Sequence, residues 1–221
     1  DAEIVAQARS DIRSGEAAFF FLYLSEMDNF LHHHCKDKQA VSERLAWYER
    51  QLQDVLSAAK QEDPEATFTI ISDHGMTPVR SHYDLVSKIE ALGLRMPQDY
   101  LSVYDSTMAR FWFFNDAARR AVTAELERTP CGRILADAEL EGLGILFPDR
   151  RFGEIVFLLE PGCLFAKSDF NGSGWNPIGM HGYHPSDPYS DAIFLSNKDP
   201  RRQMTNIADI YPCLEEAALS R

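Results

Sequence analysis

The amino-acid sequence predicts an α/β fold, with a mostly parallel central sheet flanked by helices on both faces. Short apolar runs, each too brief for a helix, alternate with longer segments whose hydrophobic residues repeat at helical spacing. The chain has 221 residues, of which 45% are hydrophobic, and this is enough for one substantial core. We therefore predict a single α/β domain over residues 1–221.

The first third of the sequence predicts a parallel β–α–β unit. A surface helix over residues 2–13 precedes an almost uninterrupted apolar run at residues 17–24, which has the length and aromatic content of an interior strand. Asp37 can cap a long amphipathic helix over residues 41–59, and residues 67–71 form a second apolar run. A strand, a crossover helix and a strand place the residues that follow both strands at one edge of the sheet.

The rest of the sequence continues this alternation. Strands are predicted at residues 100–104, 109–114, 154–160, 162–166 and 191–195. Helices are predicted at residues 82–92, 117–128 and 206–219, the last interrupted at Pro212. Residues 167–190 are rich in Gly, Pro, Asn, Ser and Asp and form one long irregular segment. A loop of that length inside a compact domain favours a functional role.

The net charge limits the partners of the protein. Lys and Arg total 22 against 34 Asp and Glu, so the formal charge is −12, which opposes binding to a nucleic-acid polymer. A nucleotide-sized substrate stays compatible with this charge, because a bound divalent metal can reverse the local field. No apolar run in the sequence has the length needed to cross a bilayer.

The cysteines and the start of the sequence add two expectations. The four cysteines are widely spaced without a C-x-x-C pair, which argues against a thiolate zinc site and a dense disulfide framework. The sequence starts at Asp1 without an initiator Met or a basic leader, so we expect the chain to be part of a longer protein. Its localisation stays open between cytoplasmic and periplasmic or secreted.

Asp and His residues follow both strands of the predicted β–α–β unit. Asp28 and His32 are four residues apart, which on a helical turn places both side chains on one face. Asp73 and His74 end the second strand, where open α/β sheets bind ligands. A polar turn without function is the alternative at each place, and it also fits the run His32–His34. Within that run, only His32 has a carboxylate four residues before it.

The irregular segment adds two imidazoles, His181 and His184. Oxygen and imidazole ligands without thiolates suit zinc or manganese. Two such metal sites a few ångströms apart are typical of phosphoryl transfer, because two cations can hold the nucleophile and the phosphate oxygens together. We therefore predict two divalent metal ions, zinc or manganese.

Three motifs stand in order along the chain. They are Asp28-x-x-x-His32, Ser72-Asp-His-Gly-Met76, and Gly179-Met-His-Gly-Tyr183 followed by Asp191-Ala-Ile-Phe-Leu195. Together they resemble the type I phosphodiesterase/nucleotide pyrophosphatase family of the alkaline phosphatase superfamily, and the resemblance covers nearly the whole chain. It implies an alkaline-phosphatase-like fold and hydrolysis of phosphodiester or pyrophosphate bonds at two zinc ions.

The resemblance also implies a role for individual residues. Asp28, His32 and His181 would hold one zinc, while Asp73 and His74 would hold part of the second. In the family, the first strand, a further aspartate and a Thr or Ser nucleophile precede the segment that matches here. We therefore expect a C-terminal portion of the catalytic domain, without a nucleophile of its own and inactive in isolation.

Three other residues are weaker candidates. The family often has a different residue at the place of His184, which we assign to substrate binding. Arg110 can meet a phosphate bidentately, or it can pair with a carboxylate. Thr77 lies close to the proposed ligands in sequence and is a candidate replacement nucleophile, although residues in turns commonly lie near a site without taking part.

Two hypotheses from different classes remain. The first is a metal-dependent phosphodiesterase or pyrophosphatase whose substrate is a small phosphate ester, a nucleotide among them. The second is a non-catalytic domain that binds metal. Phosphonate and phosphomonoester hydrolysis use the same ligands and stay open, as do the leaving group, the oligomeric state and the choice between zinc and manganese.

Overall fold

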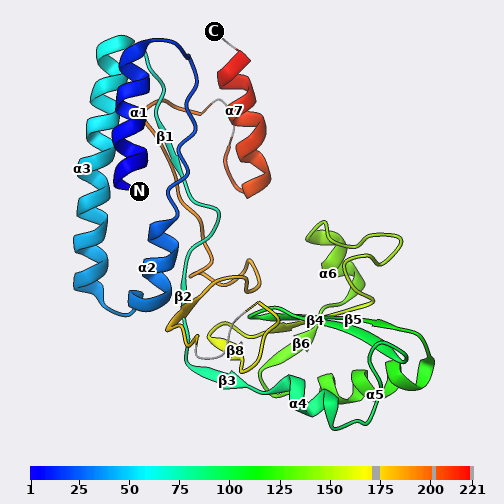
Figure 1. The fold of residues 1–221 in the computed structure, drawn as a ribbon. Helices are drawn as coiled ribbons and strands as arrows, with labels where there is room; N and C mark the ends of the chain where they lie inside the picture. The colour runs from blue at the N-terminus through cyan, green and yellow to red at the C-terminus, as the bar shows by residue number, and fades with distance from the viewer. Residues whose placement is uncertain (171–174, 201–202, 220–221) are drawn as a thin grey trace. The chain divides into compact units, whose positions relative to one another are not determined.

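Helices and strands alternate along the chain, and they group into two units in the computed structural model (Figure 1). The structure describes residues 1–170, 175–200 and 203–219. The first unit comprises Asp1–Gly75 with Asp191–Arg221, and the second comprises Met76–Ser190. The fold is mixed α/β, as expected, while a single domain over residues 1–221 stays a prediction.

Helices α1 (Ala2–Ser14), α2 (Glu26–His34) and α3 (Lys38–Glu62) open the first unit. Figure 1 shows α1 lying along α3, where Val5 and Ile12 pack against Val55 and Ala58. Asp37 caps α3 as predicted, because its carboxylate accepts hydrogen bonds from the first turn at 3.1 and 3.0 Å.

The predicted helix over residues 206–219 is not interrupted at Pro212; instead, it changes from a 3-10 turn to an α-helix before that residue. A 3-10 turn, η1 (Ile207–Asp209), leads into α7 (Ile210–Leu219). Pro212 therefore lies in the first turn of α7, where a missing N–H removes no hydrogen bond of the helix.

The predicted parallel β–α–β unit is wrong. Strand β1 (Thr69–Ile71) pairs with β10 (Phe194–Ser196), and the two run antiparallel. Within the described residues, the apolar run at 17–24 joins no ladder. Phe20 and Leu24 pack against the core between α1 and α3, whereas Phe19, Phe21 and Tyr23 are exposed. Only one side of this stretch finds apolar neighbours, so side-chain packing holds it without a backbone ladder.

A four-stranded antiparallel sheet forms the core of the second unit. Its order is β4 (Tyr100–Tyr104), β5 (Met108–Phe113), β7 (Ile155–Leu159) and β6 (Gly132–Ile134). All five residues of β7 are buried. Ile155, Phe157 and Leu159 pack with α4 (Leu85–Glu90) and α5 (Asp116–Glu127), while Val156 and Leu158 pack with α6 (Asp137–Gly142). Figure 1 shows α4 and α5 on one face of this sheet and α6 on the other.

Two short ladders complete the second unit. β2 (Thr77–Pro78) pairs antiparallel with β9 (Gly179–Met180), and β3 (Ser81–Tyr83) pairs parallel with β8 (Cys163–Phe165). Gly162, with a φ of 89°, allows the tight turn from β7 into β8.

The expectation of a mostly parallel sheet needs correction. Among the described residues, β3–β8 is the one parallel ladder of six. Continuous apolar runs suggested parallel strands, but β7 shows that helices on both faces bury an antiparallel strand just as fully.

Two other predictions agree with the structure in part. The predicted helix over residues 82–92 begins later, at Leu85, because Asp84 caps it and the preceding residues join β3. Of the predicted irregular segment, residues 171–174 lie outside the described residues, and the remainder contains β9. Within the part of the chain that the structure describes, none of the helices combines the length and the hydropathy that a bilayer crossing requires.

Candidate metal centre

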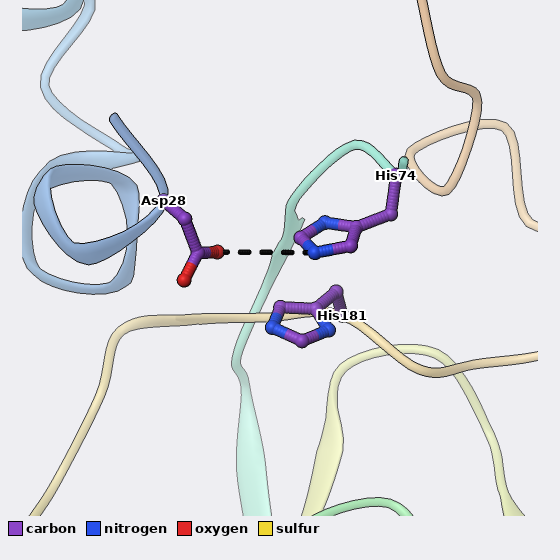
Figure 2. Close-up of side chains that lie close together, drawn as sticks. All are labelled: Asp28, His74 and His181. Atoms are coloured by element: carbon purple, nitrogen blue, oxygen red, sulfur yellow. Dashed lines mark ion pairs between the residues drawn. The ribbon is translucent and has the colours of Figure 1, made fainter. Parts of the chain in front are cut away.

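Two carboxylates and two imidazoles come together in the first unit, and we call Asp28, His32, Asp73 and His74 the Asp28 cluster. The i, i+4 spacing on α2 places Asp28 Oδ2 3.4 Å from His32 Nε2. The segment after β1 brings His74 Nε2 to 4.0 Å from Asp28 Oδ1 (Figure 2) and to 3.5 Å from Asp73 Oδ1. The predicted ligands of the first unit therefore lie together, although they come from separate elements.

The orientation of the His74 ring is fixed by the backbone. His74 Nδ1 donates a hydrogen bond to the carbonyl oxygen of Gly75 at 2.8 Å, because a carbonyl can only accept. In the neutral ring, the proton is then on Nδ1, and the lone pair of Nε2 faces the carboxylates of Asp28 and Asp73.

The other two histidines of the run on α2 have different surroundings. His33 Nδ1 donates to the Asn29 carbonyl at 2.9 Å and the residue is exposed, while the ring of His34 stacks on Phe30 with centroids 4.5 Å apart. His32, by contrast, is only 8% exposed and is directed at Asp28. Of these three histidines, His32 is therefore the one whose ring faces Asp28, and its role as a ligand stays a prediction.

His181 lies in the second unit, directly after β9. The residues that follow it are anchored on both sides: the Thr107 hydroxyl donates to the Gly182 carbonyl at 2.6 Å, and the Tyr183 hydroxyl donates to the Cys163 carbonyl at 3.0 Å. Burial raises the pKa of Tyr183 above its ordinary range, so this hydroxyl stays a donor. The segment that carries His181 is thus well supported within its unit.

His184 is held by a different set of contacts in the second unit. Its Nδ1 accepts from the hydroxyl and the N–H of Ser186 at 2.7 and 3.1 Å, and its Nε2 lies 3.1 Å from Glu139 Oε1. Both oxygens of Glu139 also accept from the Arg133 guanidinium, and these hydrogen bonds lower the pKa of Glu139. We call these three residues the Arg133–Glu139–His184 network.

Comparison with known proteins settles the family. The family described as type I phosphodiesterase / nucleotide pyrophosphatase matches the sequence over residues 2–184. The chain belongs to this family. Among curated proteins, none matches the sequence significantly.

Solved structures of the family share the fold of the chain. Human ectonucleotide pyrophosphatase/phosphodiesterase 5 has a TM-score of 0.75 at 19% identity, over 97% of this chain and 57% of its own. The murine protein has the same TM-score and identity, over 97% of this chain and 59% of its own. An inactive murine variant in complex with AMP has a TM-score of 0.68 at 19% identity, over 87% and 51%. The chain therefore spans somewhat more than half the length of these structures.

The resemblance implies a hydroxyl nucleophile for the family, and Thr77 does not fit that part. Its side chain is only 2% exposed, and its hydroxyl donates to the carboxylate of Asp187, itself buried, at 2.6 Å. Thr77 instead joins β2 to the loop after β9 inside the second unit. The structure therefore gives it a place in the packing of that unit.

Arg110, predicted to contact substrate, lies in β5. Its guanidinium is 4.8 Å from the ring centroid of Phe152, which is typical of a cation–π contact. Its role toward substrate, like that of His184, stays a prediction.

Glu139 and Asp187 were not predicted from the sequence, and they hold two of the candidate residues in place. Glu139 contacts His184 from α6, and Asp187 accepts a hydrogen bond from the Thr77 hydroxyl across 110 residues of sequence. Acidic residues are numerous in this chain, and nothing in the local pattern distinguishes these two. Only the folded second unit brings them to their partners.

Proposed function

We propose that this chain supplies the metal-binding residues of a hydrolase of phosphodiester or pyrophosphate bonds. The observation that carries the proposal is the orientation of His74. Its Nδ1–H is used by the Gly75 carbonyl, so the lone pair of Nε2 meets two carboxylates at 3.5 and 4.0 Å. A proton or a metal cation on Nε2 would make both contacts favourable.

The geometry favours a metal cation over a proton. Histidines that bind metals commonly donate their second ring N–H to a backbone carbonyl, as His74 does. Zinc bonds of about 2.0–2.1 Å in a tetrahedral arrangement separate neighbouring ligand atoms by about 3.3 Å. The Asp28–His32 and Asp73–His74 pairs, at 3.4 and 3.5 Å, are close to that spacing and longer than direct hydrogen bonds.

The donor set fits two divalent cations, which we propose to be zinc, with manganese as the alternative. Asp28, His32 and His181 would hold one ion, and Asp73 and His74 would hold part of the other. Such cations supply Lewis-acid polarisation of a phosphoryl oxygen when bound. Within this chain, Gly75 orients the His74 ring, and the helix spacing of α2 orients Asp28 toward His32.

The proposed substrate is a small phosphate ester, with a nucleotide as the leading candidate. Membership of the family supports the bond that is cleaved, and a related structure in complex with AMP supports the nucleotide. The formal charge of −12 supports a small substrate over a nucleic-acid polymer. His184 and Arg110 are proposed to contact this substrate.

The zinc content of the protein after exhaustive dialysis tests the metal assignment. We expect His181→Ala to lose the first ion, whereas the exposed neighbour variant His33→Ala should retain the content of the wild type. Equal zinc content in His181→Ala and the wild type would remove His181 from the site.

Hydrolysis of bis(p-nitrophenyl) phosphate with added zinc or manganese tests the activity. We expect at most weak turnover from residues 1–221 alone, because the resemblance places the nucleophile before the segment that matches. A longer protein with the upstream strand should turn over the ester, and Asp73→Asn should abolish this. Zinc binding without any turnover in that longer protein would favour the non-catalytic hypothesis.

A further inference from the structure

Two cysteines far apart in sequence meet inside the second unit. Cys131 directly precedes β6 and Cys163 begins β8, and their Sγ atoms are 3.0 Å apart across 32 residues of sequence. Both residues are thiols in this structure. Neither belongs to the Asp28 cluster, and nothing in the proposed function uses them.

The backbone, and not a chance rotamer, brings the two thiols together. The N–H of Glu160 donates to the carbonyl of Cys131 at 2.9 Å, and the N–H of Cys163 donates to the carbonyl of Glu160 at 3.0 Å. One residue at the end of β7 therefore holds both cysteines through its own amide and carbonyl groups. A disulfide bond is about 2.04 Å long, so closure requires the sulfurs to approach by only about 1 Å.

We propose that Cys131 and Cys163 form a reversible disulfide, and that this pair is an oxidation site of the protein. The co-reactant is a small-molecule disulfide such as oxidised glutathione. The Cys131 thiolate attacks one of its sulfurs, forming a mixed disulfide and releasing one glutathione thiolate. Cys163 then attacks the Cys131 sulfur as a thiolate, and the second glutathione thiolate leaves. The two protons of the protein thiols end on the two glutathione molecules, so one disulfide is consumed for each one formed.

The burial of the two thiols sets the order of these steps. Cys163 is only 4% exposed, whereas Cys131 is half-buried and is the residue that a dissolved disulfide can reach. Burial, together with the neighbouring Cys163 thiol, raises the pKa of Cys131 to about 12. Only a small fraction of the Cys131 side chains is then thiolate at neutral pH. We therefore expect oxidation to be slow and the reduced pair to persist in a reducing compartment.

The disulfide would join the residue before β6 to the first residue of β8, and β8 supports the segment that carries His181. The carbonyl of Cys163 accepts the hydroxyl of Tyr183, and Leu164 packs with Met180 and Tyr183. Closing a loop of this length stabilises a domain mainly by restricting its unfolded chain. We expect the melting temperature of the second unit to rise by about 5–10 °C on oxidation.

Peptide mapping of the unmodified sequence tests the pair without any substitution. After equilibration with oxidised glutathione, alkylation and proteolysis without reductant should yield one cross-linked species that contains Cys131 and Cys163. Cys35 and Cys213 should be alkylated or glutathionylated singly. Full alkylation of all four cysteines after that treatment would overturn the proposal, as would a cross-link to Cys35 or Cys213.

Two variants test the order of the steps. Cys163→Ala should accumulate glutathione on Cys131, and its melting temperature should not rise on oxidation. Cys131→Ala should leave Cys163 unmodified, because that thiol is buried. Protection from alkylation that a chelator reverses, with no covalent cross-link, would instead mean that the two thiols hold a soft metal ion, and the proposal would fail.

Discussion

Each unit contains a carboxylate near the Nε2 atom of an imidazole, and the two pairs differ in the partner of the other ring nitrogen, Nδ1. In the second unit, Ser186 donates to Nδ1 of His184, so Nε2 carries the proton and donates to Glu139. In the first unit, His74 Nδ1–H donates a hydrogen bond to the Gly75 carbonyl, and the Nε2 lone pair faces Asp28. In the first arrangement an N–H donates to the carboxylate, whereas the second leaves an Nε2 lone pair that can bind a cation.

The difference shows what a carboxylate–imidazole contact indicates about function. Distance alone does not separate the two cases, because both lie within the range of an ion pair. The partner of the other ring nitrogen separates them: a donor at Nδ1 leaves an N–H at Nε2, whereas a carbonyl at Nδ1 leaves a lone pair at Nε2 that can bind a metal where other ligands are near. On this ground the Asp28 cluster is the candidate metal site, and the Arg133–Glu139–His184 network is not part of it.

The largest expected effect is a loss of zinc affinity, and it should follow the removal of one imidazole of the two pairs and not the other. His74→Ala should lower zinc affinity by about 100-fold or more, because it removes a ligand that the backbone has already oriented. His184→Ala is the matched variant and should change zinc affinity by no more than about twofold. Competition with a chromophoric chelator measures both constants. Equal losses of zinc affinity in the two variants would contradict the distinction between the Asp28 cluster and the Arg133–Glu139–His184 network.

A smaller effect is expected for the stability of the second unit. Glu139→Gln removes the charge that both Arg133 and His184 face, and we expect a loss of about 1 kcal/mol in the free energy of unfolding. Glu141→Gln, an exposed position on the same helix, should change it by less than about 0.5 kcal/mol. Urea denaturation followed by tryptophan fluorescence measures both. If Glu139→Gln is as stable as the wild type, the network does not hold α6 in place.

The two pairs that make up the Asp28 cluster could be located in the sequence because the members of each pair are close in sequence. The i, i+4 relation of Asp28 and His32 needs only a helix, and Asp73–His74 needs only a strand that ends before it. The direction of the strands could not be predicted, since an apolar run such as β7 is buried in the same way whether its neighbours are parallel or antiparallel. The stretch at residues 17–24 was misjudged for a related reason, because apolar content does not reveal whether a partner strand is present.

Pairs of residues that are far apart in sequence could not be predicted. Thr77 with Asp187 and Cys131 with Cys163 are separated by 110 and 32 residues, and no spacing rule connects them. They depend on the register of β2 with β9 and on the turn at Gly162, which tertiary packing determines. The same holds for Glu139, whose partner His184 comes from a loop 45 residues later in the sequence (184 − 139).

The pH dependence of stability tests the role of the Glu139 carboxylate in the Arg133–Glu139–His184 network. The hydrogen bonds from Arg133 hold the pKa of Glu139 below its ordinary value of 4.5, so this carboxylate stabilises the fold above that pH. Its contribution should be lost as the pH falls through the lowered pKa. The difference in unfolding free energy between the wild type and Glu139→Gln should therefore be constant from pH 7 to about 5 and shrink below about 4.5. A difference that grows on acidification would contradict the assignment.

The smallest expected effect is that of His33→Ala, which tests whether the orientation of a ring alone makes a ligand. His33 also donates Nδ1–H to a carbonyl, that of Asn29, and so resembles His74 in that respect. It differs in what its other nitrogen can meet, because the residue is exposed on α2 and lacks the carboxylate four positions earlier that His32 has. Zinc affinity in His33→Ala should stay within about twofold of the wild type, while His32→Ala should lose it. A loss at His33→Ala as large as that at His32→Ala would move the ligand by one position on the helix, and the spacing argument for Asp28 would no longer hold.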